Sequence, residues 1–190
     1  MNQNQQEQQF GMRESFNLLY AAAKVHAMCF WPIIRRDFGT EALGFPAFFA
    51  MVLMLMVGAF GRIPEMFPYL GFWLIMLILA RARTFQMVRQ GVVWHSRYEG
   101  IPWLALCFPL IRTESRAKRM MEPVLCLLAG AAVYQLLSHG LGVFIMAGFL
   151  SMAIVVGIND ELDRKRLAAM RDAEIEQKWL VARYRGQVDE

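Results

Sequence analysis

The stretch from Ala42 to Phe60, ALGFPAFFAMVLMLMVGAF, contains nineteen consecutive residues without a charged side chain. A helix rises about 1.5 Å per residue, so this run is long enough to cross most of the roughly 30 Å apolar core of a bilayer. A surface helix of a soluble protein would carry a polar face, and this segment has none. The stretch therefore predicts a transmembrane helix, and the fold class that we expect is an all-α integral membrane protein.

The composition of the whole chain agrees with this expectation. Of the 190 residues, 57% are hydrophobic and 19% are charged. Soluble domains mix these two classes along amphipathic elements. Here they alternate in separate apolar and charged blocks, which is typical of a membrane protein with several spans.

Three further apolar segments extend the pattern to four transmembrane helices in two helical hairpins. Residues 42–82 form the first hairpin, with spans at Ala42–Phe60 and Met66–Ala82 and a turn at Gly61–Glu65. Residues 124–158 form the second, with spans at Val124–Ser138 and Leu141–Ile158 and a turn at His139 and Gly140. Glycine and proline mark the first turn, and short turns require antiparallel neighbours.

The segment before the first span has two predicted parts. Residues 1–11 are rich in Gln and Asn, and we expect a disordered polar N-terminus. Residues 12–41 predict an amphipathic interfacial helix and a linker, because apolar side chains recur at helical spacing up to Pro32. The alternative is a fifth span over residues 16–34, which Lys24 and His26 disfavour.

The charged segments are residues 83–123 and the tail, residues 159–190. The first is a cytoplasmic or interfacial basic segment. Counted from Arg81, residues 81–123 hold eight basic residues against three acidic ones, a net charge of +5. The tail has seven basic and eight acidic residues, a net charge of −1, and no Gly or Pro before Gly186. We therefore expect the fourth span to continue as one helix from Leu141 to Tyr184, with a cytoplasmic C-terminal part.

The basic residues also predict the orientation of the chain. In a four-span arrangement, nineteen of the twenty Lys and Arg residues lie on one side, and Arg62 alone lies on the other. The positive-inside rule assigns the basic side to the cytoplasm. The expected location is the cell inner (cytoplasmic) membrane, multi-pass, with both termini cytoplasmic.

Aromatic and basic residues of the 83–123 segment are candidates for contact with lipid headgroups or with a partner protein. A basic surface beside the membrane attracts anionic headgroups. The alternative is an ordinary aromatic belt between two interfacial helices. The candidates are Trp94, Arg97, Tyr98, Trp103, Arg112, Arg116, Lys118 and Arg119.

Two other residue patterns indicate association between helices. Small residues four positions apart allow a neighbouring backbone to approach, and the pairs are Ala147 with Ser151 and Ala153 with Gly157. An apolar stripe along the tail is suited to docking a partner helix or a second copy. The stripe consists of Leu162, Ala169, Ala173, Leu180 and Tyr184.

No catalytic, nucleotide-binding or metal-binding motif occurs in the sequence. We therefore expect no enzyme activity and no cofactor, and nucleic-acid binding is disfavoured because the basic side faces the membrane. The expected function is that of a non-catalytic membrane subunit or scaffold that assembles a larger complex. The alternative is a lipid-interacting or pore-forming oligomer, such as a small channel or transporter component.

Overall fold

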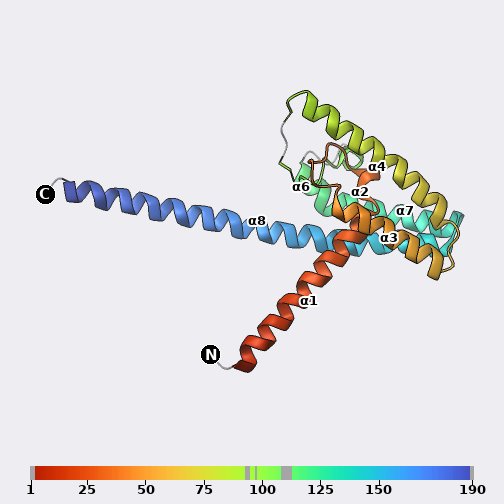
Figure 1. Cartoon of the computed structure of the whole chain (residues 1–190), viewed down its shortest axis with the longest axis horizontal. Coiled ribbons are helices and arrows are strands. Elements are labelled where there is room, and N and C mark those ends of the chain that lie inside the picture. The colour runs from red at the N-terminus through yellow and green to blue at the C-terminus, as the bar shows by residue number, and fades with distance from the viewer. Residues whose placement is uncertain (1–2, 93–94, 97, 108–112, 189–190) are drawn as a thin grey trace. The chain divides into compact units, whose positions relative to one another are not determined.

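The computed structural model describes residues 3–92, 95–96, 98–107 and 113–188, and every regular element in those ranges is a helix. This confirms the all-helical prediction. Two compact units divide the chain, Met1–Val155 and Val156–Glu190. The elements, most of them labelled in Figure 1, are α1 Gln3–Met28, α2 Trp31–Ile34, α3 Phe45–Phe60, α4 Met66–Arg89, α5 Trp103–Leu106, α6 Glu114–Arg116, the π-helical turn η1 Ala117–Met121, α7 Glu122–Leu136 and α8 His139–Val188.

Among the described residues, two helices are long and apolar enough to cross a membrane, judged by length and composition. They are α4, over Met66–Arg89, and α8, over His139–Gly186. The helix α3 is also apolar but has only 16 residues. The predicted spans at Met66–Ala82 and Leu141–Ile158 therefore lie on helices that meet this criterion.

The helix α4 is longer than the sequence predicts. We expected the second span to end at Ala82, whereas one helix continues to Arg89. No Gly or Pro lies between Gly71 and Gly91, so nothing in this stretch interrupts the helix. Gly91 ends it with a φ of 75°, a left-handed conformation that favours glycine.

The N-terminal helix also differs from the prediction. Helix α1 begins at Gln3, so the backbone of residues 3–11 is helical rather than disordered. Glutamine is a good helix former, and a polar composition alone does not prevent a helix. At its other end α1 stops at Met28, and the short α2 follows at Trp31.

The turn between α1 and α2 is one of the most buried parts of the first unit. Met28, Cys29 and Trp31 are each exposed by 1% or less. The indole Nε1 of Trp73 donates a hydrogen bond to the Met28 carbonyl at 3.1 Å, and the Tyr69 hydroxyl donates to the Cys29 carbonyl at 2.9 Å. Carbonyls at a helix end need such partners when they are buried. The C-terminal part of the predicted interfacial helix therefore packs in the core of the first unit, and its position at a membrane interface stays a prediction.

The helices α7 and α8 approach each other closely at glycines. A Cβ atom added at Gly130 would lie 2.6 Å from the backbone nitrogen of Met146, and one added at Gly142 would overlap the Cα atom of Tyr134. Gly148 packs in the same way against Phe30 and the Cys126 thiol. Glycine is required at these positions because any side chain would push the helices apart.

The two tight turns of the first unit lie side by side. The Ser138 hydroxyl, after α7, donates a hydrogen bond of 3.1 Å to the Glu65 carboxylate, before α4. Gly140 lies directly against Ile63, so that an added Cβ would be 2.8 Å from the Ile63 side chain. The α3–α4 and α7–α8 connections therefore belong to the same end of this unit.

The predicted small-residue pairs do not mediate these helix contacts. Ala147 and Ala153 are exposed, and a Cβ at Gly157 would meet no described atom within 4 Å. Ser151 is half-buried and hydrogen-bonded to Nδ1 of His26 at 2.7 Å. Packing of Ala147, Ala153 and Gly157 against a partner stays a prediction.

The second unit is the C-terminal part of α8. Helix α8 is continuous over 50 residues, which confirms the predicted uninterrupted helix. Every residue from Glu161 to Gly186 is exposed, including the predicted stripe of Leu162, Ala169, Ala173, Leu180 and Tyr184.

Candidate functional site

A buried ion pair between Arg35 and Glu122 is the centre of the candidate site. Arg35 follows α2 in an extended conformation, and Glu122 is the first residue of α7. The Nε and Nη2 atoms of Arg35 donate to the two Glu122 oxygens at 2.9 and 2.6 Å, and both side chains are 0% exposed. This two-point geometry is the strongest that an Arg–carboxylate pair adopts.

Two more charges extend the pair into a balanced cluster. The carboxylate of Glu99 lies 3.4 Å from Nη1 of Arg35 and 3.1 Å from Nζ of Lys24. The Trp31 ring stacks on the Arg35 guanidinium, with 4.2 Å from Cζ to the ring centroid. Burial acts to lower the pKa of Arg35, but Glu122 and Glu99 outweigh it and the pKa is raised, so Arg35 stays charged.

Two extended segments hold Glu99 in place. The amide of Arg36 donates to the Ile101 carbonyl at 2.9 Å, Gly39 donates to Tyr98 at 2.9 Å, and Glu41 donates to Ser96 at 2.9 Å. The two segments are therefore antiparallel. Their backbones approach closely at Gly100, where a side chain would not fit. A Cβ at Gly100, whose φ is 88°, would lie 2.8 Å from the Arg36 carbonyl oxygen.

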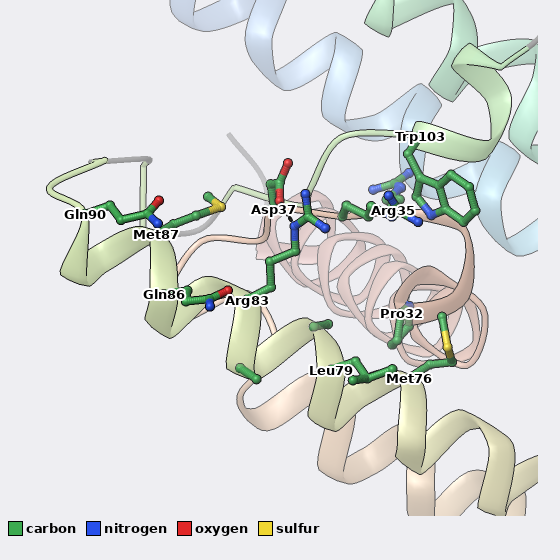
Figure 2. Close-up of a pocket in the computed structure, with 13 residues that line it drawn as sticks. Pro32, Arg35, Asp37, Met76, Leu79, Arg83, Gln86, Met87, Gln90 and Trp103 are labelled. Atoms are coloured by element: carbon green, nitrogen blue, oxygen red, sulfur yellow. Dashed lines mark hydrogen bonds and ion pairs between the residues drawn. The ribbon is translucent and has the colours of Figure 1, made fainter.

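Beside the ion cluster, a groove of about 650 Å³ lies between α4 and the α2–Asp37 segment. Figure 2 shows the labelled residues of both walls, with Pro32 and Arg35 on one side and Met76, Leu79 and Arg83 of α4 on the other. The volume is within the usual range for small-molecule sites, about 300–1,000 Å³.

The polar end of the groove is positively charged. Nε of Arg83 donates to the Asp37 carboxylate at 2.7 Å, and Asp37 has a left-handed backbone with a φ of 59°. The Arg36 guanidinium lies over the Trp103 ring, with 3.8 Å from Cζ to the centroid. Glu122 neutralises Arg35. The other charged residues that line the groove are Arg36, Arg83 and Asp37, so the lining has a net charge of +1.

The structure brings together only some of the predicted headgroup-contacting residues. The Tyr98 hydroxyl donates to Glu114, and Nζ of Lys118 lies 2.6 Å from the same carboxylate and 4.7 Å from the Tyr98 ring centroid. Trp103 lines the groove, whereas Arg116 and Arg119 are exposed outside it. Trp94, Arg97 and Arg112 lie outside the described residues.

The Tyr98–Glu114–Lys118 contacts shift two ionisation equilibria. Partial burial acts to raise the pKa of Glu114, but the hydrogen bonds from Lys118 and Tyr98 outweigh it and lower the pKa. Burial, followed by the hydrogen bond to Glu114, raises the pKa of Tyr98. At neutral pH the carboxylate is therefore charged and the phenol is protonated, so this cluster is a structural contact and not a reactive pair.

Sequence reasoning missed the Arg35–Glu122 pair and the groove. Neither Arg35 nor Glu122 is among the candidate site residues that the sequence predicts. A usable signal existed, because a lone acid directly before an apolar run requires a basic partner. Five basic residues other than Arg62 lie in the first 82 positions, and no local pattern distinguishes Arg35 as the partner.

The described ranges hold no group of three or more His, Cys, Asp or Glu residues that could bind a metal ion. The fold and the site therefore describe a helical protein with two possible membrane-crossing helices and a buried, charge-balanced cluster. No protein-family model, no curated protein and no solved structure matches the chain.

Proposed function

We propose that the chain is an integral membrane protein with four spans in two hairpins and both termini cytoplasmic. The proposal is supported by the apolar side chains that α3 and α4 leave exposed, since large exposed apolar surfaces need a covering phase. They include Phe45, Phe48, Phe49, Leu55, Met56 and Phe60 on α3 and Phe67, Phe72, Ile75, Ile78 and Leu79 on α4.

The contacts at the two ends of the first unit agree with this topology. The turns around Glu65 and Ser138 touch each other, as the non-cytoplasmic turns of two hairpins would. The Arg83–Asp37 and Arg35–Glu122 pairs lie near the other helix ends, where the basic residues gather. Lys24 and Arg35 both bind Glu99. In this proposal the α1–α2 segment enters the membrane and returns, so residues 16–34 do not form a fifth span.

The topology predicts opposite labelling of two positions by a membrane-impermeant maleimide. In a Cys107→Ser background, which removes the exposed native thiol, the Arg62→Cys variant should react in intact cells. The Gln177→Cys variant should react only after the membrane is opened. The buried Cys29 and Cys126 provide the background signal. Reaction of both variants from the same side would reject the four-span arrangement.

Within the membrane, we infer a non-catalytic subunit or scaffold that assembles a larger complex. The single observation that carries this inference is α8, whose apolar N-terminal part continues without interruption into a charged part that is exposed along its whole length from Glu161 to Gly186. A helix that is exposed on every side gains little from its own chain, since most helical stability comes from packing. Its stripe is suited to a partner helix.

A matched pair of double variants tests the docking role. Ala173→Glu with Leu180→Glu charges the stripe, and Ile175→Glu with Ala182→Glu places the same two charges on the opposite helix face, since residues seven apart share a face. All four positions are exposed. After affinity purification in mild detergent, the stripe variant should lose at least about tenfold of its co-purified partners, a cost of roughly 1.4 kcal/mol, and the control should keep them. Equal recovery by both variants would contradict the docking role.

The second candidate, a lipid-interacting or pore-forming oligomer, is favoured by one observation, the positively charged groove beside α4. The pore-forming and scaffold functions predict different results for the purified protein. A pore-former should conduct ions in a planar bilayer without partners, and a scaffold should not.

A further inference from the structure

We propose that the groove between α2 and α4 binds one anionic phospholipid, with its phosphate at Arg36 and Arg83 and an acyl chain along Met76 and Leu79. This inference rests on the proposed membrane insertion and adds a defined ligand to it. The occupant is a membrane lipid rather than a soluble anion because both walls of the groove change from apolar to charged in the same direction.

The change in polarity follows the residue order of α4. Met76, Leu79 and Ala80 line one part of the groove, and Arg83, Gln86 and Gln90 line the next. From Met76 to Gln90 the helix rises about 21 Å at 1.5 Å per residue. An amphiphile with a long apolar part and a polar head fits a site of this length and polarity.

The facing wall has the same order. Pro32, in α2, lies opposite the apolar part, and Arg35, Arg36 and Asp37 follow it in sequence. Figure 2 shows Pro32 near Met76 and Leu79, and Asp37 near Arg83. The contact between Arg83 and Asp37 joins the two walls at the polar end. A bound headgroup would therefore lie where both walls carry charge.

The charged groups at the polar end suit a phosphate. The bond to Asp37 uses Nε of Arg83, and no described residue binds its two terminal nitrogens. The Arg36 guanidinium lies over the Trp103 ring, a contact that restrains it and leaves its charge in place. Guanidinium groups match the oxygens of a phosphodiester better than lysine ammonium groups would. The amides of Gln86 and Gln90 are further donors on the same wall.

Lipid binding is measured on the full chain, purified in a mild non-ionic detergent, stripped of lipid and titrated with phosphatidylglycerol or phosphatidylcholine. Native mass spectrometry counts the bound molecules. We expect one phosphatidylglycerol to bind at least about tenfold more tightly than phosphatidylcholine. The Arg36→Gln variant, which breaks no ion pair, should weaken phosphatidylglycerol binding about fivefold, and Arg36→Gln with Arg83→Gln about thirtyfold.

Two further variants separate the site from general effects. Arg89→Gln removes the same charge from the same helix outside the groove, and it should change affinity by less than about twofold, because exposed charges act weakly when they are not in contact. Leu79→Trp fills the apolar part without changing any charge. It should weaken binding of phosphatidylglycerol and leave any binding of inorganic phosphate unchanged.

The outcomes distinguish the possible errors. Equal losses for Arg89→Gln and Arg36→Gln, equal affinity for the two lipids, displacement of phosphatidylglycerol by millimolar inorganic phosphate, or no effect of Leu79→Trp would each overturn the lipid site. Carbonate extraction tests the premise separately. Release of the chain from membranes would reject the proposed insertion itself, whereas a membrane-embedded chain without lipid preference would reject only this inference.

Discussion

Replacing Glu122 by alanine is expected to destabilise the protein by about 3–5 kcal/mol, the typical cost of leaving a buried charge without its partner. Arg35 is 1% exposed, and Glu122 accepts its two shortest hydrogen bonds. Without that carboxylate, the acceptors among the described residues would be the Glu99 carbonyl and carboxylate oxygens, both at the longer distance of 3.4 Å. For a chain of this size the melting temperature should fall by about 10 °C or more.

The measurement is thermal unfolding of the full chain in detergent, with three companion variants. Glu122→Gln keeps the size and one oxygen acceptor, so its loss should be smaller. Arg35→Met with Glu122→Leu removes both charges and should recover most of the stability, because apolar side chains of similar volume can replace a buried ion pair. Glu161→Ala removes an acid that is exposed and 3.7 Å from Lys165, and it should cost less than about 0.5 kcal/mol.

The melting temperatures of these variants show whether the Arg35–Glu122 ion pair stabilises the fold as much as its geometry indicates. If Glu122→Ala unfolds at the same temperature as Glu161→Ala, the Arg35 side chain is not held in a dry environment by Glu122. If the double variant is less stable than Glu122→Ala, the cost comes from packing around α7 and not from the unpaired charge.

The second large effect is expected for Gly142→Leu. A Cβ at Gly142 would overlap backbone atoms of Tyr134, which cannot rotate away as the end of a side chain could. Helices α7 and α8 would have to separate, and overpacking of this kind costs about 1–3 kcal/mol or more.

Gly71→Leu is the matched control for this variant. Gly71 lies inside α4, in an apolar helix like α8, and an added Cβ would meet nothing within 4 Å. Leucine favours helix over glycine by up to about 1 kcal/mol. The control should therefore be as stable as the parent chain or slightly more stable, and Gly142→Leu should melt well below it. Similar melting temperatures for the two variants would show that the close approach at Gly142 does not support the fold.

Local sequence signals were sufficient for most of the helices. The uncharged run that ends at Phe60 corresponds to α3, and the turn at Gly61–Glu65 separates it from α4 as expected. The absence of Gly and Pro between Gly157 and Gly186 predicts the continuous α8. The same rule, applied more strictly after Ala82, would have placed the end of α4 at Gly91. These features depend on neighbours within a few residues.

The candidate site could not be predicted from such local sequence signals. The Arg35–Glu122 pair joins residues 87 positions apart, and the Tyr69 and Trp73 bonds that hold the α1–α2 turn join residues 40 and 45 apart. No periodicity or motif encodes such pairings. Trp103 was predicted as a headgroup contact. Arg36, whose guanidinium lies over the Trp103 ring, was not among the predicted contacts.

The sequence by itself determined most of the helical segments, where the apolar residues lie along the chain and where the basic residues gather. Those properties follow from side-chain polarity and from backbone preferences that act over one or two helical turns. Only the tertiary structure decided that α1 stops at Met28 and turns into the core, and that Arg35 meets Glu122. Desolvated charges must find opposite charges in space, and which ones meet is set by the packing of all the helices together.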